Sequence, residues 1–174
     1  MAHPKHQAVR KRYQYRCGYC GVSETDTGGE LTIDHYHPVS AGGDDSDDNL
    51  VYTCYRCNLY KSDIQMDPAL PESEFRILHP LLDSTTAHLL LNVLTGKLEP
   101  LTDRGRFHLV TLRLNRAELI AHRQQKRMVE LLRVRMDVYE QEIAQLRQEI
   151  LVQSELLVRL SEQQRQITDT EENP

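Results

Sequence analysis

The chain has 174 residues, of which 39% are hydrophobic, with no tryptophan and only two phenylalanines. This composition argues against one large apolar core and favours a small domain with an extension. The formal net charge of -5 argues against a protein that coats nucleic acid indiscriminately, although a net charge hides local patches. The first residues do not resemble a signal peptide, and no run reaches the roughly 20 apolar residues of a membrane span. We therefore expect a soluble, cytoplasmic protein with no membrane partner.

The first sixteen residues are basic and aromatic, with Lys and Arg side chains placed among His and Tyr. Such a run attracts a phosphate backbone, which makes Arg12 and Arg16 candidate DNA contacts. A charged, frayed terminus is the competing interpretation. A short helix from Gln7 is expected to lead into the next motif.

The four cysteines form two pairs with the same spacing, Cys17-Gly-Tyr-Cys20 and Cys54-Tyr-Arg-Cys57. Two such turns bring four thiolates onto one metal, which is the ligand set of a structural zinc site. Buried free thiols are the alternative, and the repeated spacing makes it weak. Cysteines used in this way suit a reducing compartment, and zinc would stabilise a domain that is short of apolar core.

Between the two pairs, polar residues 22–30 predict an exposed loop, and residues 31–35 predict a strand that ends in Asp34 and His35. A carboxylate binds a hard divalent cation, and a neutral imidazole accepts a proton from water near pH 7. Adjacent strand residues point to opposite faces, so both reach one phosphate only if the strand curls at its end. A surface Asp-His pair with a local hydrogen bond is the alternative.

The chain continues with three features before the second cysteine pair. His37 shares the side of His35 in an extended segment, so it either contacts the phosphate or metal or faces solvent. The acidic run 44–48 lacks the Gly and terminal Glu of an EF-hand and is expected to be a solvated turn. Residues 49–53 predict the second strand of a hairpin, with Asn49 at its start.

Residues 58–63 predict a helix after the second cysteine pair. Asn58 and Lys61 are three residues apart and share a helix face. This spacing lets Asn58 complete a metal site with Asp34 while Lys61 reaches a phosphate oxygen.

The order Cys-x-x-Cys, Asp-His, Asn, Cys-x-x-Cys-Asn-x-x-Lys resembles the HNH endonucleases of the ββα-metal fold, and most closely the phage endonuclease VII type. The resemblance covers roughly residues 10 to 66. It implies a divalent-metal-dependent endonuclease that hydrolyses DNA phosphodiester bonds, with His35 as general base and Asn49 bracing the loop that carries it. Many members have His where this chain has Asn58. Asn58 matches a His-Asn-Asn subset and leaves one anionic ligand, Asp34, which suits Mg²⁺ or Mn²⁺ that retains several waters.

The resemblance leaves two alternatives open. A Holliday-junction or branched-DNA resolvase would use the same chemistry on another substrate, and a non-catalytic zinc module would only bind DNA. Within the catalytic interpretation, His35, Asn49 and Lys61 act in catalysis and the four cysteines hold structural Zn²⁺. The candidate DNA contacts are Arg12, Arg16, His37 and Arg56.

The remaining sequence predicts a connector at 67–114 and a long helix at 115–168. Thr95-Gly96 is expected to be a turn, and residues 107–114 alternate enough to predict a strand, so the connector should hold a β-hairpin. The isolated His79, His88 and His108 lack paired spacing and are treated as structural or exposed.

The long helix is expected to begin in capping-box style at Asn115-Arg-Ala-Glu118 and to end before a frayed tail at 169–174. It carries an apolar heptad stripe, with position a at Val129, Met136, Ile143, Ile150 and Leu157, and position d at Leu132, Tyr139, Leu146, Gln153, Leu160 and Ile167. The stripe predicts a coiled coil that forms a homodimer. A helix that folds back onto its own chain is the alternative. The predicted fold class is α+β, with the nuclease-like module at residues 1–66.

Overall fold

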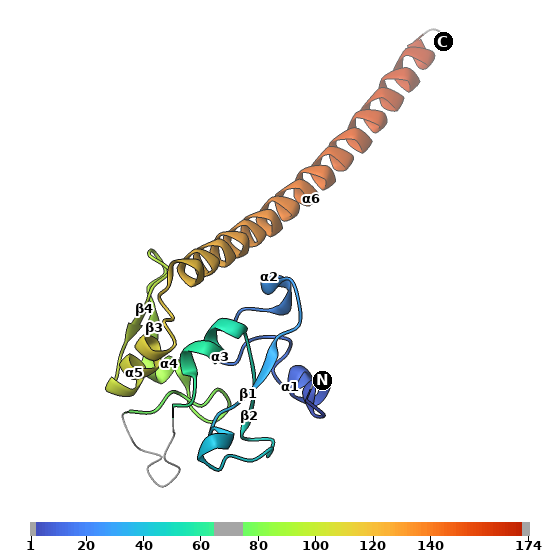
Figure 1. Ribbon diagram of the computed structural model, residues 1–174. Helices are drawn as coiled ribbons and strands as arrows, with labels where there is room; N and C mark the ends of the chain where they lie inside the picture. Colours follow the sequence, from blue (N-terminus) through green and yellow to red (C-terminus); the bar gives the residue numbers. More distant parts are fainter. Residues whose placement is uncertain (1–2, 65–74, 172–174) are drawn as a thin grey trace. The chain divides into compact units, whose positions relative to one another are not determined.

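The computed structural model describes residues 3–64 and 75–171, the last six of them by their backbone only. The chain forms two compact units, Met1–Gln125 and Lys126–Pro174. The elements in chain order are α1 (His6–Arg12), α2 (Glu24–Thr27), β1 (Thr32–His35), the short 3-10 helix η1 (Val39–Ala41), β2 (Leu50–Thr53), α3 (Tyr55–Lys61), α4 (Thr85–His88), β3 (Leu89–Leu91), β4 (Leu98–Pro100), α5 (Asp103–Thr111) and α6 (Ala117–Glu171) (Figure 1). The α+β class is therefore confirmed.

Strands β1 and β2 form an antiparallel hairpin, and α3 follows β2 directly (Figure 1). The register pairs Asp34 with Val51 and His35 with Leu50. All four residues of β2 are buried, as expected for a strand of β-branched, aromatic and aliphatic side chains. The predicted order of strand, strand and helix is confirmed, but α3 begins at Tyr55 inside the second cysteine pair and ends at Lys61, so the predicted helix at 58–63 is shifted.

The segment 22–30 contains a helical turn that the sequence analysis did not predict. Ser23 caps α2, because its hydroxyl accepts from the Asp26 backbone N–H while the Asp26 carboxylate accepts from the Ser23 backbone N–H. The helix has no buried residue, and residues 25–30 are exposed as expected, but Val22 at the start of the segment is buried in the core. The predicted helix before the first cysteine pair is confirmed as α1.

The core of the first unit extends past residue 66, where the predicted module ends. Val9 and Leu50 belong to the same buried cluster as Ile77, Leu112 and Leu114, and each is at most 2% exposed. Described residues from Ile77 onward therefore complete the core of the hairpin and α3.

The predicted strand at 107–114 is wrong, because residues 103–111 form α5. The Thr102 hydroxyl accepts from the Gly105 backbone N–H and caps this helix. A Cβ atom at Gly105 would lie 2.1 Å from the His88 carbonyl oxygen, so only glycine lets α5 approach α4 this closely. The predicted hairpin exists, but β3 and β4 form it around a turn that contains Thr95-Gly96.

The long helix begins at Ala117, and Asn115 does not act as its predicted cap. The Asn115 amide instead hydrogen-bonds the backbone N–H and carbonyl of Leu98 on β4, at 2.8 Å each. Arg123, one turn into α6, donates to the carbonyl oxygens of Gly96 and Leu114. Tertiary hydrogen bonds thus attach the first turns of α6 to the β3–β4 hairpin.

The second unit consists of α6 from Lys126 onward. The apolar side chains at positions a and d between Val129 and Leu160 are 42–67% exposed in the single chain. The side chain of Ile167, the last predicted d position, lies outside the described residues. The helix continues to Glu171, three residues past its predicted end at 168. Within the described residues, no helix has a stretch long and apolar enough to cross a membrane.

Candidate active site and metal centre

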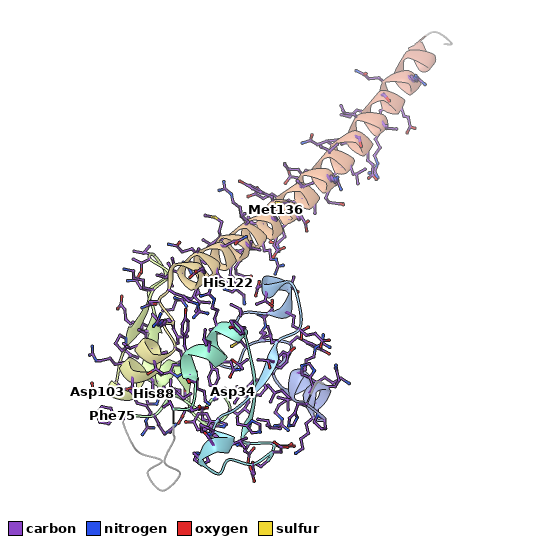
Figure 2. All side chains as sticks on the ribbon, in the orientation of Figure 1. Asp34, Phe75, His88, Asp103, His122 and Met136 are labelled. Carbon is purple, nitrogen blue, oxygen red and sulfur yellow. The ribbon has the colours of Figure 1, made fainter. Side chains whose placement is uncertain are left out.

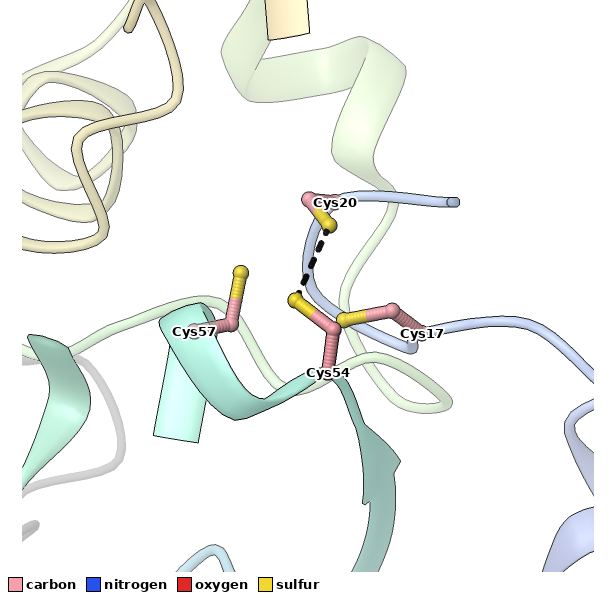
Figure 3. Close-up of side chains that lie close together, drawn as sticks. All are labelled: Cys17, Cys20, Cys54 and Cys57. Carbon is pink, nitrogen blue, oxygen red and sulfur yellow. Dashed lines mark hydrogen bonds between the residues drawn. The ribbon is translucent and has the colours of Figure 1, made fainter. Parts of the chain in front are cut away.

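The four cysteines converge on one point from the two ends of the hairpin module (Figure 3). Their sulfur atoms all lie within 4.8 Å of one another, and the Sγ atoms of Cys20 and Cys54 are 3.7 Å apart. A tetrahedral zinc with Zn–S bonds of about 2.3 Å needs sulfur atoms about 3.8 Å apart. The donor set and its spacing therefore fit the predicted Zn²⁺.

Polar and charged groups surround the four sulfurs. The Thr53 hydroxyl lies 3.6 Å from Cys17 Sγ at the buried end of β2. Burial lowers the pKa of Arg116, but the charges of Cys57 and Cys20 raise it by more than burial lowers it. The net pKa is above its usual value, so the guanidinium stays charged beside the sulfurs. Hydrogen bonding to Cys17 raises the pKa of the Cys57 thiol, and a bound cation would remove that effect.

Asp34 belongs to β1, and its nearly buried carboxylate contacts Lys61 of α3 (Figure 2). The Tyr19 hydroxyl donates to Oδ2 at 2.8 Å, and Lys61 Nζ donates to Oδ1 at 3.1 Å. Burial raises the pKa of Asp34, although Lys61 and Tyr19 oppose that shift. These contacts fix the carboxylate in one orientation.

Lys61 is placed differently from the prediction that it reaches a phosphate oxygen. Its side chain is 1% exposed, and its ammonium also donates to the His35 carbonyl oxygen at 2.6 Å. The ammonium is thus used inside the protein, where it ties α3 to the end of β1.

Asp34, His35, Asn58 and Lys61 line one pocket of about 480 Å³ between β1, η1 and α3. No hydrogen bond holds the Asn58 side chain among the residues that the structure describes, and this side chain is partly exposed. A carboxylate and an amide oxygen that share a pocket with open space fit a Mg²⁺ or Mn²⁺ ion that keeps several waters. The predicted metal ligands and general base are therefore brought to one place.

Asn49 braces the loop between β1 and β2 with its buried amide. The side-chain oxygen accepts from the His37 backbone N–H at 2.6 Å, and the amide nitrogen donates to the carbonyl oxygens of His37 and Asp44. A Cβ atom at Gly43 would lie 1.9 Å from the His37 carbonyl oxygen, so this tight loop requires glycine there. This is the arrangement expected of a residue that holds the loop after the general base.

The imidazole of His35 is held by Asp45, which belongs to the acidic run for which we predicted a solvated turn. His35 Nε2 lies 2.7 Å from Asp45 Oδ1, and His3 lies on the other side of the same carboxylate. Asp47 pairs with Lys5 at 3.0 Å and with Arg12 at 2.7 Å. The acidic run is exposed as expected, but the carboxylates of Asp45 and Asp47 are paired with basic side chains. The sequence does show an acidic run and a basic N-terminal segment, which could have suggested ion pairs between them. It does not show which acidic residue pairs with which basic one.

Two of the four candidate DNA contacts already have partners within the protein, and the other two are exposed. Arg12 is bound to Asp47, and His37 Nε2 contacts the Ala41 carbonyl oxygen at 2.9 Å. Arg16 is exposed on the segment before Cys17. Arg56 is exposed and lines a larger pocket of about 960 Å³ together with His35 and Asn58.

The other predicted features of this unit have structural roles. His108 is 3% exposed and its Nδ1 accepts from the Leu78 backbone N–H at 2.9 Å. His79 is also buried, and its ring bonds the carbonyl oxygen of Asp48 and the backbone N–H groups of Leu81 and Leu82. Their treatment as structural histidines is confirmed.

A zinc-binding ββα module with a carboxylate, an imidazole and an amide in one pocket is the arrangement of a metal-dependent nuclease. Residues 17–63 match the family model of the HNH endonuclease, so the chain carries an HNH endonuclease domain and the predicted resemblance is confirmed. The four-cysteine cluster fits the zinc-containing members of that family. Comparison with curated proteins and with solved structures gives no match.

Proposed function

We propose that the protein is a divalent-metal-dependent endonuclease that hydrolyses DNA phosphodiester bonds. The observation that carries this proposal is the pocket shared by Asp34, His35, Asn58 and Lys61 within the matched residues 17–63. A zinc module that only binds DNA has no need for this combination of side chains in one place.

In the proposed reaction, His35 takes a proton from the attacking water. Its Nε2 faces Asp45, and the tautomer that donates Nε2–H to this carboxylate leaves Nδ1 free to accept a proton. Lys61 and Tyr19 hold the Asp34 carboxylate, and Asn49 holds the loop after His35. Mg²⁺ or Mn²⁺ bound by Asp34 and Asn58 would stabilise negative charge on the phosphate and the leaving oxygen.

The decisive measurement is plasmid cleavage by the pure protein with Mg²⁺ or with EDTA. General-base assistance contributes about 10² to 10⁴ in rate, so His35→Ala should lose activity by that factor with its zinc content unchanged. His88→Ala is the matched control, because His88 contacts Thr102 and does not line the pocket. Cleavage by His35→Ala at the wild-type rate would refute the assigned role. Tight DNA binding by wild type without any cleavage would support the non-catalytic zinc module.

We further propose that two copies associate through the heptad stripe of α6. The stripe runs from Val129 to Leu160 with its apolar side chains exposed, and a second copy is the partner that matches its regular spacing. In a parallel dimer, Arg135 faces Glu140 of the second copy and Glu142 faces Arg147, so both pairs attract.

The dimer is tested by light scattering during gel filtration. Wild type should run at twice the chain mass, and Ile143→Lys should run as a monomer because it places a charge in the seam. Glu149→Lys is the control on the same helix outside the a and d positions. A monomeric wild type at high micromolar concentration would refute the association.

The substrate shape distinguishes the remaining alternatives. A dimer carries two reaction sites, which permits cuts in both strands, and the resemblance to the endonuclease VII type makes a four-way junction the alternative substrate. Parallel assays on linear duplex and on a four-way junction of the same sequence separate the two. The four cysteines form no disulfide and together make a candidate zinc site, and we place the protein in the reducing cytoplasm for that reason.

A further inference from the structure

A second group of metal-ligating side chains lies beside the proposed reaction site. His3, His35 and Asp45 each offer one ligand atom, and these atoms all lie within 4.8 Å of one another. The segment before α1 supplies His3, the end of β1 supplies His35, and the β1–β2 loop supplies Asp45. The group shares no residue with the four-cysteine cluster or with the Asp34–Asn58 pair.

The geometry points to a site for a divalent transition-metal ion such as Zn²⁺, bound by His3, His35 and Asp45. His35 Nε2 lies 2.7 Å from Asp45 Oδ1, and His3 Nε2 lies 3.3 Å from Asp45 Oδ2. Ligands about 2.0 to 2.2 Å from a tetrahedral zinc lie about 3.3 to 3.6 Å from one another. Small rotations of the three side chains therefore reach this geometry and leave one coordination position open.

Two observations show that the group is already assembled for a ligand. The His3 Nε2 atom is shielded from solvent and has no hydrogen-bond partner of good geometry among the described residues, although it faces the Asp45 carboxylate. The loop that carries Asp45 is fixed from outside the group, because Lys5 donates to the Asp45 carbonyl oxygen at 2.7 Å and His79 bonds the Asp48 carbonyl oxygen. A bound cation would satisfy His3 without moving the loop.

The donor set selects a particular class of ion. Two imidazoles and one carboxylate suit Zn²⁺, Co²⁺ and Ni²⁺, whereas Mg²⁺ prefers oxygen ligands and retains its waters. The site therefore differs in ion preference from the oxygen donors Asp34 and Asn58. Mg²⁺ and a transition-metal ion can therefore be added to the same sample, and the binding of each ion can be measured separately.

Occupancy of this site would inhibit the nuclease, an inference that rests on the proposed function. A metal on His35 Nε2 displaces the proton from that nitrogen, so the neutral ring carries its proton on Nδ1. Nδ1 then cannot accept a proton from water. The same imidazole is thus a general base when Asp45 holds it and a metal ligand when the transition metal is bound.

The binding test uses full-length protein with one zinc at the four-cysteine site, titrated with Co²⁺ and followed by visible absorption. Wild type should bind one further equivalent, and His3→Ala and Asp45→Asn should each weaken this binding by more than about tenfold. Asp47→Asn is the control, because Asp47 lies on the same loop but pairs with Lys5 and Arg12. Wild type that binds no second equivalent, or variants that bind it as tightly, would overturn the site.

The activity test compares each protein's cleavage rate in Mg²⁺ with and without enough Zn²⁺ to fill the second site. The rate with Zn²⁺ divided by the rate without Zn²⁺ should be below about 0.1 for wild type, since loss of a general base costs at least tenfold. The same ratio should stay near one for His3→Ala. An unchanged ratio in wild type with the site filled would overturn the inhibitory role. Metal binding without any DNA cleavage in Mg²⁺ would leave the site standing and refute the proposed function.

Discussion

The Lys61–Asp34 pair provides a direct test of how the site is held together. The two charged groups are 3.1 Å apart, and their side chains are 1% and 9% exposed. At an effective dielectric constant of about 20, their attraction is about 5 kcal/mol. Removal of one partner from a buried pair costs about 3 to 5 kcal/mol, because the other charge is left without compensation. Lys61→Met should therefore lower the free energy of unfolding by that amount.

The assay is urea unfolding of zinc-loaded protein without Mg²⁺, for wild type, Lys61→Met, Asp34→Asn and the double variant. We expect the double variant to lose about 3 kcal/mol less than the sum of the two single losses, since it leaves no unpaired buried charge. If Lys61 instead contacts DNA phosphate, Lys61→Met would be as stable as wild type and would only weaken DNA binding. That result, or additive losses in the cycle, would refute the internal role of Lys61.

Three further predictions concern the supports of the site. Removal of zinc with a chelator should abolish hydrogen-exchange protection of the β2 amides, because the ion closes the loop between the two cysteine pairs. Asn49→Ala should cost about 1 to 3 kcal/mol in urea unfolding, since it removes three hydrogen bonds from the β1–β2 loop. Burial lowers the pKa of His108 from 6.5 to about 4, so the unfolded state binds a proton that the folded state does not. Stability should therefore be full above about pH 7 and fall by about 2 kcal/mol by about pH 5, and His108→Asn should lose this component of the pH dependence in the same assay.

The candidate metal ligands and reacting side chains could be predicted from the sequence, because each needs a particular residue type at a particular spacing. The two Cys-x-x-Cys pairs allow few arrangements other than a shared metal, and the strands between them follow from β-branched and aromatic residues. The order Asp34, His35, Asn49, Asn58 then predicted the carboxylate, the imidazole and the amides of one site. The structure brings these residues to the pocket and to the loop beside it.

Segments whose conformation depends on distant partners were predicted less well. Residues 107–114 alternate like a strand, but the close approach at Gly105 and the cap from Thr102 place 103–111 in a helix. Asn115 fits a helix cap by sequence, but the backbone of Leu98 offers it two hydrogen bonds. In both cases tertiary contacts outweighed the local pattern.

The sequence by itself predicted the four candidate zinc ligands, the hairpin-and-helix order and the candidate reacting groups, because these predictions depend on residue type and on short spacing. Only the tertiary structure decided how those groups are held. Lys61 is buried against Asp34, and Asp45 and His3 surround the imidazole of His35. Partners at such separations along the chain meet through the packing of the whole unit, and no local pattern encodes which acidic residue meets which basic one.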